Sequence, residues 1–213
     1  MQNLADLRKD YALATLDIST VASNPFKQFE QWFGEAQHSQ VLEPNAMTLA
    51  TVNEFGRPSA RIVLLKGLEE DKFVFYTNYQ SAKGHDLDKN PACAITFFWP
   101  EMERQIRIEG VAERQNNEKS EQYFQSRPRA SQISAWASPQ STVVKDRTIL
   151  EERAAQIETK FTGQEKLPKP NQWGGYKIEP LSIEFWQGRT GRLHDRILYT
   201  KTTDTWKISR LAP

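Results

Sequence analysis

The spacing of apolar residues near the start of the chain predicts one amphipathic helix. Apolar side chains recur there at intervals of three and four residues, which places them on one helical face: Phe26, Phe29, Phe33 and Ala36. Asn24 suits the N-cap of this helix, and Pro25 suits its first position. Residues 1–20 are polar and are predicted to form a short helix or a mobile N-terminal arm.

Extended segments dominate from residue 46 onward. Runs rich in β-branched and aromatic residues, bounded by turn residues, predict strands. The predicted strands are 46–52, 59–66, 72–77, 92–99, 104–114, 182–187, 196–201 and 205–210. A turn-rich loop over 53–58 joins the first two as a hairpin. Because no regular helical crossovers separate the strands, the pattern favours a mainly antiparallel sheet.

Helices are predicted between some of the strands, over 81–90, 116–125, 130–136 and 144–161. The last of these is charged and carries an apolar stripe on one side, and the two prolines that follow in 166–171 predict a loop. We find no internal repeat, low-complexity tract or linker. The sequence therefore predicts a single domain over residues 1–213, mainly β, with peripheral helices that cover the ends of a barrel.

Charge and cysteine content restrict the functions that this chain can have. The 28 Lys and Arg balance 27 Asp and Glu, so a general attraction to nucleic acid or to an anionic membrane is excluded. An anion site must therefore be a local cluster. Cys93 is the sole cysteine and is expected to be a small buried hydrophobe. With three scattered histidines, no metal site is predicted. Without a signal peptide or membrane span, the protein is expected to be cytoplasmic.

Motifs for nucleotide binding by glycine-rich loops and for a nucleophilic serine elbow are absent from the sequence. Cations beside strands and helix starts stand out instead. Arg61 and Lys66 bracket four aliphatic residues on a predicted strand. Strict alternation puts them on opposite faces, so either a bulge or twist brings them together or they serve two ligands. The alternative is an amphipathic strand with solvated ends.

A second cluster combines a strand end with a helix start. Tyr76 and Thr77 end a predicted strand, and Ser81 and Lys83 follow at the start of a helix. A helix N-terminus with hydroxyl groups and a lysine is a good seat for a phosphate group. N-capping by Ser81 alone explains the same residues equally well.

A third cluster contains Tyr123, Arg127 and Ser131, which lie four residues apart and would share one helical face. Pro128 is expected to interrupt that helix. A guanidinium with hydroxyl donors suits a phosphate monoester; the alternative is a surface turn between two helices.

The fourth cluster lies near the C-terminus. Trp186 could stack on a flat heteroaromatic ring, and Arg192 and His194 share a face if that segment is extended. A lone histidine is more often structural than catalytic. Together, the four clusters suggest ligands with more than one phosphate group.

These motifs resemble the pyridoxamine 5′-phosphate oxidase family, from about residue 8 to the C-terminus. The most specific stretches are 61–66, 126–129 with 131–133, 173–175, 184–188 with 192–196, and the C-terminal 206–213. The resemblance implies an FMN-binding split β-barrel that forms a homodimer with FMN sites at the subunit interface. It also implies an activity. Pyridoxamine 5′-phosphate or pyridoxine 5′-phosphate would become pyridoxal 5′-phosphate by hydride transfer to FMN, which dioxygen reoxidises with release of hydrogen peroxide.

The resemblance also assigns residues to each ligand. FMN would be bound, in part from the second subunit, by Arg61, Ile62, Lys66, Tyr76, Thr77, Lys83, Gln105, Gln140, Ser141, Trp186 and Arg196. The substrate's phosphate would be held by Lys66, Tyr123, Arg127 and Ser131. Substrate binding would also involve Arg192 and His194, which are the implied catalytic residues, and the N-terminal patch Arg8, Lys9, Asp10 and Tyr11.

One position departs from the family pattern. The family usually has arginine and then lysine after the serine at 81, whereas this chain has Ala82 before Lys83. The departure predicts weaker FMN binding unless another cation compensates. Two other interpretations stay open: a flavoprotein of the same fold with another substrate, and a non-catalytic binder of FMN or pyridoxal 5′-phosphate. A nucleic-acid binder is disfavoured by the balanced charge.

Overall fold

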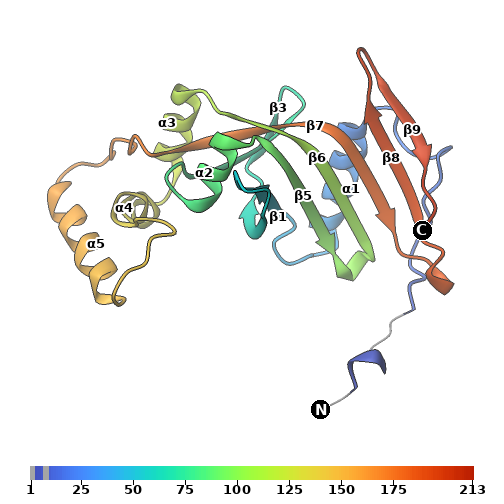
Figure 1. Ribbon diagram of the computed structural model, residues 1–213, viewed down its shortest axis with the longest axis horizontal. Helices are drawn as coiled ribbons and strands as arrows, with labels where there is room; N and C mark the ends of the chain where they lie inside the picture. Colours follow the sequence, from blue (N-terminus) through green and yellow to red (C-terminus); the bar gives the residue numbers. More distant parts are fainter. Residues whose placement is uncertain (1–2, 7–9) are drawn as a thin grey trace. The chain divides into compact units, whose positions relative to one another are not determined.

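A computed structural model describes residues 3–6 and 10–213 of the chain (Figure 1). The chain divides into two compact units. The first unit comprises Met1–Leu49, Ala94–Gly110 and Pro180–Pro213, and the second comprises Ala50–Cys93 and Val111–Glu179. Arg8 and Lys9 of the predicted substrate patch lie outside the described residues.

Antiparallel pairing dominates the strands. The strands are β1 Ala46–Val52, β2 Pro58–Leu64, β3 Gly67–Glu69, β4 Lys72–Asn78, β5 Ala92–Trp99, β6 Arg104–Arg114, β7 Trp173–Gln187, β8 Asp195–Lys201 and β9 Trp206–Arg210. They pair in the order β2-β1-β5-β6-β7-β4-β3, with β8 on β7 and β9 on β8. The β3–β4, β4–β7, β7–β8 and β8–β9 pairs are antiparallel. The predicted mainly antiparallel sheet is therefore confirmed.

In the first unit, helix α1 (Pro25–His38) forms where the apolar spacing predicts it. The Asn24 side chain caps the helix by accepting from the backbone N–H of Phe26 at 2.8 Å. Phe29 of α1 packs against Phe97 of β5 with ring centroids 5.3 Å apart, and Trp32 packs edge-on against Phe185 of β7 at 5.2 Å. Burial of each ring contributes about 1.5–3 kcal/mol. Local capping and this apolar face together fix the helix. The unit also holds the short 3-10 turns Leu4–Asp6, Pro100–Met102 and Thr190–Arg192.

Four helices belong to the second unit. They are α2 Ala82–Lys89, α3 Asn117–Ser126, α4 Arg129–Ala137 and α5 Thr148–Lys160, with α4 and α5 side by side (Figure 1). A small apolar core joins the last three helices to the start of β7 and contains Phe124, Ile133, Phe161, Leu167 and Trp173. This core fixes the corner between α3 and α4 against β7.

Three boundaries differ by more than one residue from those that the sequence predicts. Strand β7 starts at Trp173 rather than at 182, because residues 173–178 pair with β4 despite two glycines and Pro180. Strand β2 ends at Leu64, so Lys66 lies beyond it, and the short strand β3 was not predicted. Helix α5 starts at Thr148 rather than at 144, after Asp146, whose side chain accepts from the Ile149 N–H.

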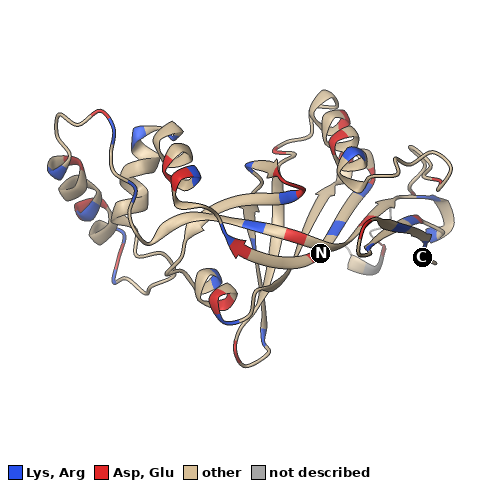
Figure 2. Ribbon diagram, turned by 90° about the horizontal axis from the view of Figure 1, so that it is seen from above, with Lys and Arg blue, Asp and Glu red and all other residues tan. Residues whose placement is uncertain are grey.

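Acidic and basic residues are interspersed along the ribbon (Figure 2), in agreement with the net charge of +1. No helix within the described residues has the length and apolar character that a membrane span requires. Cys93 is buried, and burial raises the pKa of its thiol to about 12. The expectation that it is a buried hydrophobe is confirmed.

Candidate active site

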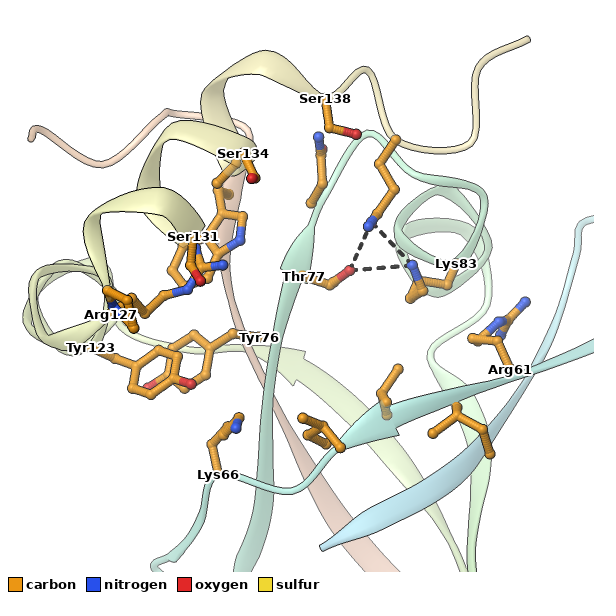
Figure 3. A pocket seen from close by; sticks show the side chains of 18 residues that line it. Arg61, Lys66, Tyr76, Thr77, Lys83, Tyr123, Arg127, Ser131, Ser134 and Ser138 are labelled. Atoms are coloured by element: carbon orange, nitrogen blue, oxygen red, sulfur yellow. Dashed lines mark hydrogen bonds between the residues drawn. The ribbon is translucent and has the colours of Figure 1, made fainter. Parts of the chain in front are cut away.

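A cavity of about 640 Å³ lies within the second unit (Figure 3). Its walls come from β2, the end of β4, the start of α2, the α3–α4 corner, α4 and the start of β7. Four cations line it, namely Arg61, Lys66, Lys83 and Arg127, and no Asp or Glu is among its described lining residues. Its volume is typical of small-molecule sites. A cavity with this charge is suited to anionic ligands.

At one end of the cavity, Lys83 lies among neutral acceptors. Its Nζ donates to Thr77 Oγ1 at 3.3 Å, Ser81 Oγ at 3.2 Å and Gln140 Oε1 at 3.2 Å. Thr77 Oγ1 also donates to Gln140 Oε1 at 3.1 Å. Burial, and then the neighbouring charge of Arg61, lower the pKa of Lys83. An anion bound between the two cations would relieve both effects.

Arg61 of β2 is held in the cavity wall by hydroxyl groups. Its guanidinium donates to Thr51 Oγ1 and to Ser59 Oγ, each at 2.7 Å. Thr51 Oγ1 in turn donates to Asp86 Oδ2 of α2 at 2.7 Å. Burial lowers the pKa of Arg61, and the charge of Asp86 opposes that shift. Because Nη1 and Nη2 are each held by a hydroxyl group, the guanidinium of Arg61 has a fixed position in the cavity wall.

Ser81 combines the two interpretations that the sequence left open. Its side chain is the N-cap of α2 and accepts from the backbone N–H of Gly84 at 3.4 Å. It also accepts from Lys83 Nζ. The capping role therefore coexists with a role in orienting the cavity lysine.

At the other end of the cavity, the chain turns sharply between α3 and α4. Arg127 and Pro128 have extended backbones and form this corner, so Pro128 interrupts the helix as expected. Tyr123, Arg127 and Ser131 nevertheless all line the cavity. Figure 3 shows these three side chains together, apart from Lys83 and Arg61. The cavity therefore has two groups of cations.

Arg127 itself has an unusual environment for a guanidinium. The group is half-buried, and burial lowers its pKa. Its Nη1 is buried and has no hydrogen-bond partner within residues 3–6 and 10–213. Leaving a buried charged donor unsatisfied is costly, which indicates a place where a ligand completes the site.

Three aromatic rings form a stack beside Arg127. The centroids of Tyr76 and Tyr123 are 3.9 Å apart and those of Tyr76 and Trp173 are 5.4 Å apart, with planes inclined by 19° and 10°. Burial raises the pKa of Tyr76 to about 12, so its phenol stays protonated at neutral pH. All three rings line the cavity.

The two glycines after Trp173 leave room for two tyrosine side chains, one of which, Tyr76, belongs to this stack. In the β4–β7 pairing, Gly175 lies opposite Tyr76 and Gly174 opposite Thr77. A Cβ on Gly175 would lie 2.8 Å from Tyr76 Cε1, and one on Gly174 would lie 2.1 Å from the Tyr79 hydroxyl. Side chains at these positions would therefore collide with the two tyrosines.

Arg61 and Lys66 line the same cavity although alternation would separate them. The strand ends at Leu64, and Lys66 donates its backbone N–H to Val74 O of β4 at 2.8 Å. Because the chain leaves the strand after Leu64, the alternation of strand faces does not apply to Lys66, and both side chains reach the same cavity. Ile62, also predicted for FMN, lines the cavity as well.

Several lining residues were not predicted as site residues from the sequence: Val63, Leu64, Asn78, Pro128, Ser134, Ala135, Ser138 and Trp173. The spacing of residues along the chain gave a signal for two of them. Ser131, Ser134 and Ser138 follow one another at three and four residues, so their hydroxyls share one side of α4. Trp173 lay before the predicted strand 182–187, although residues 173–175 are among the stretches that carry the family resemblance.

The remaining predicted residues do not line this cavity. Ser141 is exposed, directly after the lining residue Gln140, and has a φ of 69°. The others described belong to the first unit and are Asp10, Tyr11, Gln105, Trp186, Arg192, His194 and Arg196.

Within the first unit, Tyr11, Trp186 and His194 form an aromatic cluster. Ring centroids are 5.8 Å apart for Tyr11 and Trp186, and 4.6 Å for Trp186 and His194. His194 Nδ1 accepts from the backbone N–H of Arg189 at 3.1 Å, so neutral His194 carries its proton on Nε2. A Cβ on Gly188 would lie 2.7 Å from Tyr11 Cβ, so glycine there permits the close approach.

The two arginines near this cluster differ in their surroundings. Arg192 is exposed, ends the 3-10 turn Thr190–Arg192 and has a φ of 61°. The segment is therefore not extended, and the strand face that Arg192 and His194 would share does not form. Arg196 donates to both carboxylate oxygens of Glu184, at 2.7 and 3.0 Å, which raises the pKa of Arg196.

Comparison with known proteins identifies the family. Residues 33–161 match the family described as pyridoxamine 5′-phosphate oxidase. Residues 173–213 match the pyridoxine 5′-phosphate oxidase C-terminal dimerisation region. The chain belongs to the pyridoxamine 5′-phosphate oxidase family. Proteins named pyridoxine/pyridoxamine 5′-phosphate oxidase from Burkholderia mallei (strain SAVP1) and Burkholderia thailandensis are each 55% identical to it over 216 residues, covering all of both chains.

Solved structures confirm the fold of this pyridoxamine 5′-phosphate oxidase family member. PhzG from Burkholderia lata 383, in complex with tetrahydrophenazine-1-carboxylic acid, is 28% identical and has a TM-score of 0.87 over 94% of this chain and 99% of its own. A pyridoxamine 5′-phosphate oxidase-related, FMN binding protein from Nostoc punctiforme is 19% identical, with a TM-score of 0.71 over 91% of this chain and 100% of its own. The predicted split β-barrel is confirmed, and the chain is an oxidoreductase of this family's type.

Proposed function

We propose that the protein is an FMN-dependent oxidase that converts pyridoxamine 5′-phosphate or pyridoxine 5′-phosphate to pyridoxal 5′-phosphate. Dioxygen would be the electron acceptor and hydrogen peroxide the second product. The observation that carries this proposal is one cavity with two groups of cations and no carboxylate in its described lining. A cofactor and a substrate that each bear a phosphate group match that charge distribution. Full-length identity of 55% to proteins of that name supports the same substrates.

The residues at the Lys83 end fit the phosphate of FMN. Two cations, Arg61 and Lys83, meet there with the hydroxyl of Thr77 at the start of α2. The lowered pKa of Lys83 reflects a buried positive charge that an anion would stabilise. When bound, FMN would accept a hydride from the 4′ carbon of the substrate and pass two electrons to dioxygen.

At the other end, Lys66, Tyr123, Arg127 and Ser131 would hold the phosphate of the substrate. The unpartnered Nη1 of Arg127 supports this assignment. Anchoring the phosphate fixes the distance of the reacting carbon from the flavin, and orientation of this kind contributes strongly to rate.

We further propose that the protein is a homodimer, because residues 173–213 match a dimerisation region. Gln105, Ser141, Trp186 and Arg196 would complete the FMN site, in part from the second subunit. Arg192 and His194 would place the substrate's ring and handle its proton, with the neutral His194 offering an Nε2–H donor. The segment with Arg8, Lys9, Asp10 and Tyr11 would close over the substrate and exclude water. We assign this activity to the cytoplasm.

A second candidate follows from PhzG, whose structure holds a reduced aromatic carboxylic acid. An oxidase for such an acid would need one carboxylate site rather than a seat for a phosphate dianion. Its 28% identity is well below the 55% of the pyridoxine/pyridoxamine 5′-phosphate oxidases. The two candidates predict different substrates for the same cavity.

The test is a visible spectrum of the purified protein, followed by substrate addition without dioxygen. We expect a yellow protein whose flavin absorbance bleaches with pyridoxamine 5′-phosphate and returns with air, releasing one peroxide per pyridoxal 5′-phosphate. Pyridoxamine without phosphate, at equal concentration, serves as the control and should bleach far more slowly. Bleaching by tetrahydrophenazine-1-carboxylic acid alone would favour the second candidate, and a flavin that no substrate bleaches would indicate a storage protein.

A further inference from the structure

The guanidinium of Arg127 contacts aromatic rings rather than hydrogen-bond acceptors. Its central carbon lies 4.8 Å from the centroid of the Trp173 ring and 5.8 Å from that of Phe124. We propose that Trp173 is a positioning residue: it holds the guanidinium of Arg127 over its ring and leaves the N–H donors for the phosphate of a monoester ligand. The identity of that ligand rests on the proposed function, whereas the role of Trp173 toward a phosphate group does not.

A neighbouring arginine shows what a purely structural guanidinium looks like in this corner. Arg129 donates from Nε to Glu158 at 2.8 Å, and from its two Nη atoms to Gln164 O at 2.6 Å and Phe161 O at 3.1 Å. Arg127 makes no side-chain hydrogen bond or ion pair to any residue that the structure describes. Arg127 and Arg129 are two residues apart in the same motif. Their positions in the sequence therefore do not distinguish a structural arginine from a ligand-binding one, whereas their interaction partners do.

Contact with an aromatic ring, rather than with a hydrogen-bond acceptor, explains how Arg127 is held without consuming its donors. The five N–H groups lie in the plane of the guanidinium and point outward from its edges. The face of an aromatic ring attracts the positive charge without supplying an oxygen acceptor for these donors. A carboxylate partner would instead occupy two donors and neutralise the charge, and would compete with the phosphate.

Trp173 is itself fixed in place. Its side chain is 6% exposed and packs edge-on against Phe124 with centroids 5.2 Å apart. Its plane is within 10° of that of Tyr76, and its backbone pairs with Asn78 of β4. A ring confined on two sides cannot follow the guanidinium elsewhere, so it defines one position for Arg127.

The experiment compares Trp173→Leu and Trp173→Phe with the same substitutions at Trp136. Trp136 is the matched control because it packs against the same small core and also lies near a cation, with Lys160 Nζ 5.0 Å from its ring. It is not among the residues that line the cavity. The measurement is the dissociation constant of inorganic phosphate and of pyridoxal 5′-phosphate, with pyridoxal as the ligand without phosphate, on the FMN-loaded protein.

We expect Trp173→Leu to weaken the binding of inorganic phosphate and of pyridoxal 5′-phosphate by about five- to thirty-fold, which is the range for a desolvated cation–aromatic contact. The dissociation constant of pyridoxal should change by less than about two-fold. Trp173→Phe keeps a ring face and should stay within about three-fold of the unaltered protein. Both Trp136 variants should bind all three ligands normally. In an Arg127→Met background, the Trp173 substitutions should have no further effect on phosphate binding.

Equal loss for pyridoxal and pyridoxal 5′-phosphate would overturn the inference, because it would show a general packing defect. So would an unchanged phosphate affinity in Trp173→Leu, or full additivity with Arg127→Met. Should Trp173→Leu fail to fold, Trp173→Met, which also lacks a ring but fills irregular space in a core, replaces it in both backgrounds and is expected to weaken phosphate binding by the same factor. Phosphate binding that depends on Trp173, in a protein that does not oxidise pyridoxamine 5′-phosphate, would leave this inference intact and contradict only the proposed function.

Discussion

Lys83 offers a direct test of the proposed cofactor-phosphate site, through the substitution Lys83→Met. Methionine keeps an unbranched apolar stem that is one atom shorter than lysine, and it removes the charge and the donors. The three acceptors of Lys83 keep other partners: Thr77 still donates to Gln140, and Ser81 donates to Asn78 O at 2.7 Å. The substitution therefore measures the effect of removing the cation while the surrounding hydrogen bonds stay in place.

The expected magnitudes differ between the ligand-free and FMN-bound protein. A hydrogen bond to a charged group contributes about 1.5–3 kcal/mol, which corresponds to about ten- to more than a hundred-fold weaker FMN binding. Without FMN, Lys83 is half-buried beside Arg61 and its pKa is lowered, so its charge is a cost to folding. Loss of the lysine should then change the free energy of unfolding by less than about 1 kcal/mol.

The assay is a titration of the flavin-free protein followed by quenching of flavin fluorescence. Riboflavin, which lacks the phosphate, is the ligand control, and Lys89→Met in the last turn of the same helix is the variant control. We expect Lys83→Met to weaken the binding of FMN and to leave the affinity for riboflavin unchanged. The control variant Lys89→Met should bind both ligands with normal affinity. Equal weakening of FMN and riboflavin, or unchanged FMN affinity, would refute the assignment of Lys83 to the phosphate.

The pH dependence of stability gives an independent check. The pKa of Lys83 in the folded protein is below its ordinary value of 10.5, so the unfolded chain binds this proton more tightly. Stability therefore rises with pH between the folded and unfolded pKa values. The destabilising contribution of Lys83 is fully present below its pKa in the folded protein and is relieved as pH rises from there toward 10.5. Relative to Lys83→Met, the flavin-free protein should gain stability over that window, and a constant difference would contradict the burial argument.

Two further predictions concern other parts of the chain. Ala82 is exposed at the first position of α2, and Ala82→Arg should tighten FMN binding by about ten-fold at low salt and less at high salt; unchanged affinity in a fluorescence titration would show that another cation already compensates. The Glu103 carboxylate accepts from the N–H groups of Ala12 and Leu13 at 2.8 and 3.0 Å. Glu103→Ala should therefore speed hydrogen exchange at both amides. Protection equal to that of the parent protein would show instead that this segment is held by its side chains.

Local patterns in the sequence determined many elements correctly. The Asn24 cap and the three- and four-residue spacing specify helix α1 because both act within one turn. Strands 92–99 and 104–114 agree with the structure at both ends. The members of each cation cluster were also evident in the sequence, because a charged or hydroxyl side chain beside a strand end or helix start is a local feature.

Partners distant in sequence decided the rest. Strand β7 extends back to Trp173 because β4 supplies hydrogen-bond partners for residues 173–178, and no local pattern around Gly174 and Gly175 shows that pairing. The Arg61 and Lys66 side chains line one cavity because β2 ends before Lys66.

The two arginines of the α3–α4 corner show most clearly what only the tertiary structure decided. In the sequence, Arg127 and Arg129 flank Pro128 and are chemically identical. Folding supplies Glu158 and two carbonyl groups to Arg129, but to Arg127 it supplies the face of Trp173. The sequence determines that a cation is present, whereas the surroundings that the fold provides decide whether its charge is neutralised within the protein or left for a ligand.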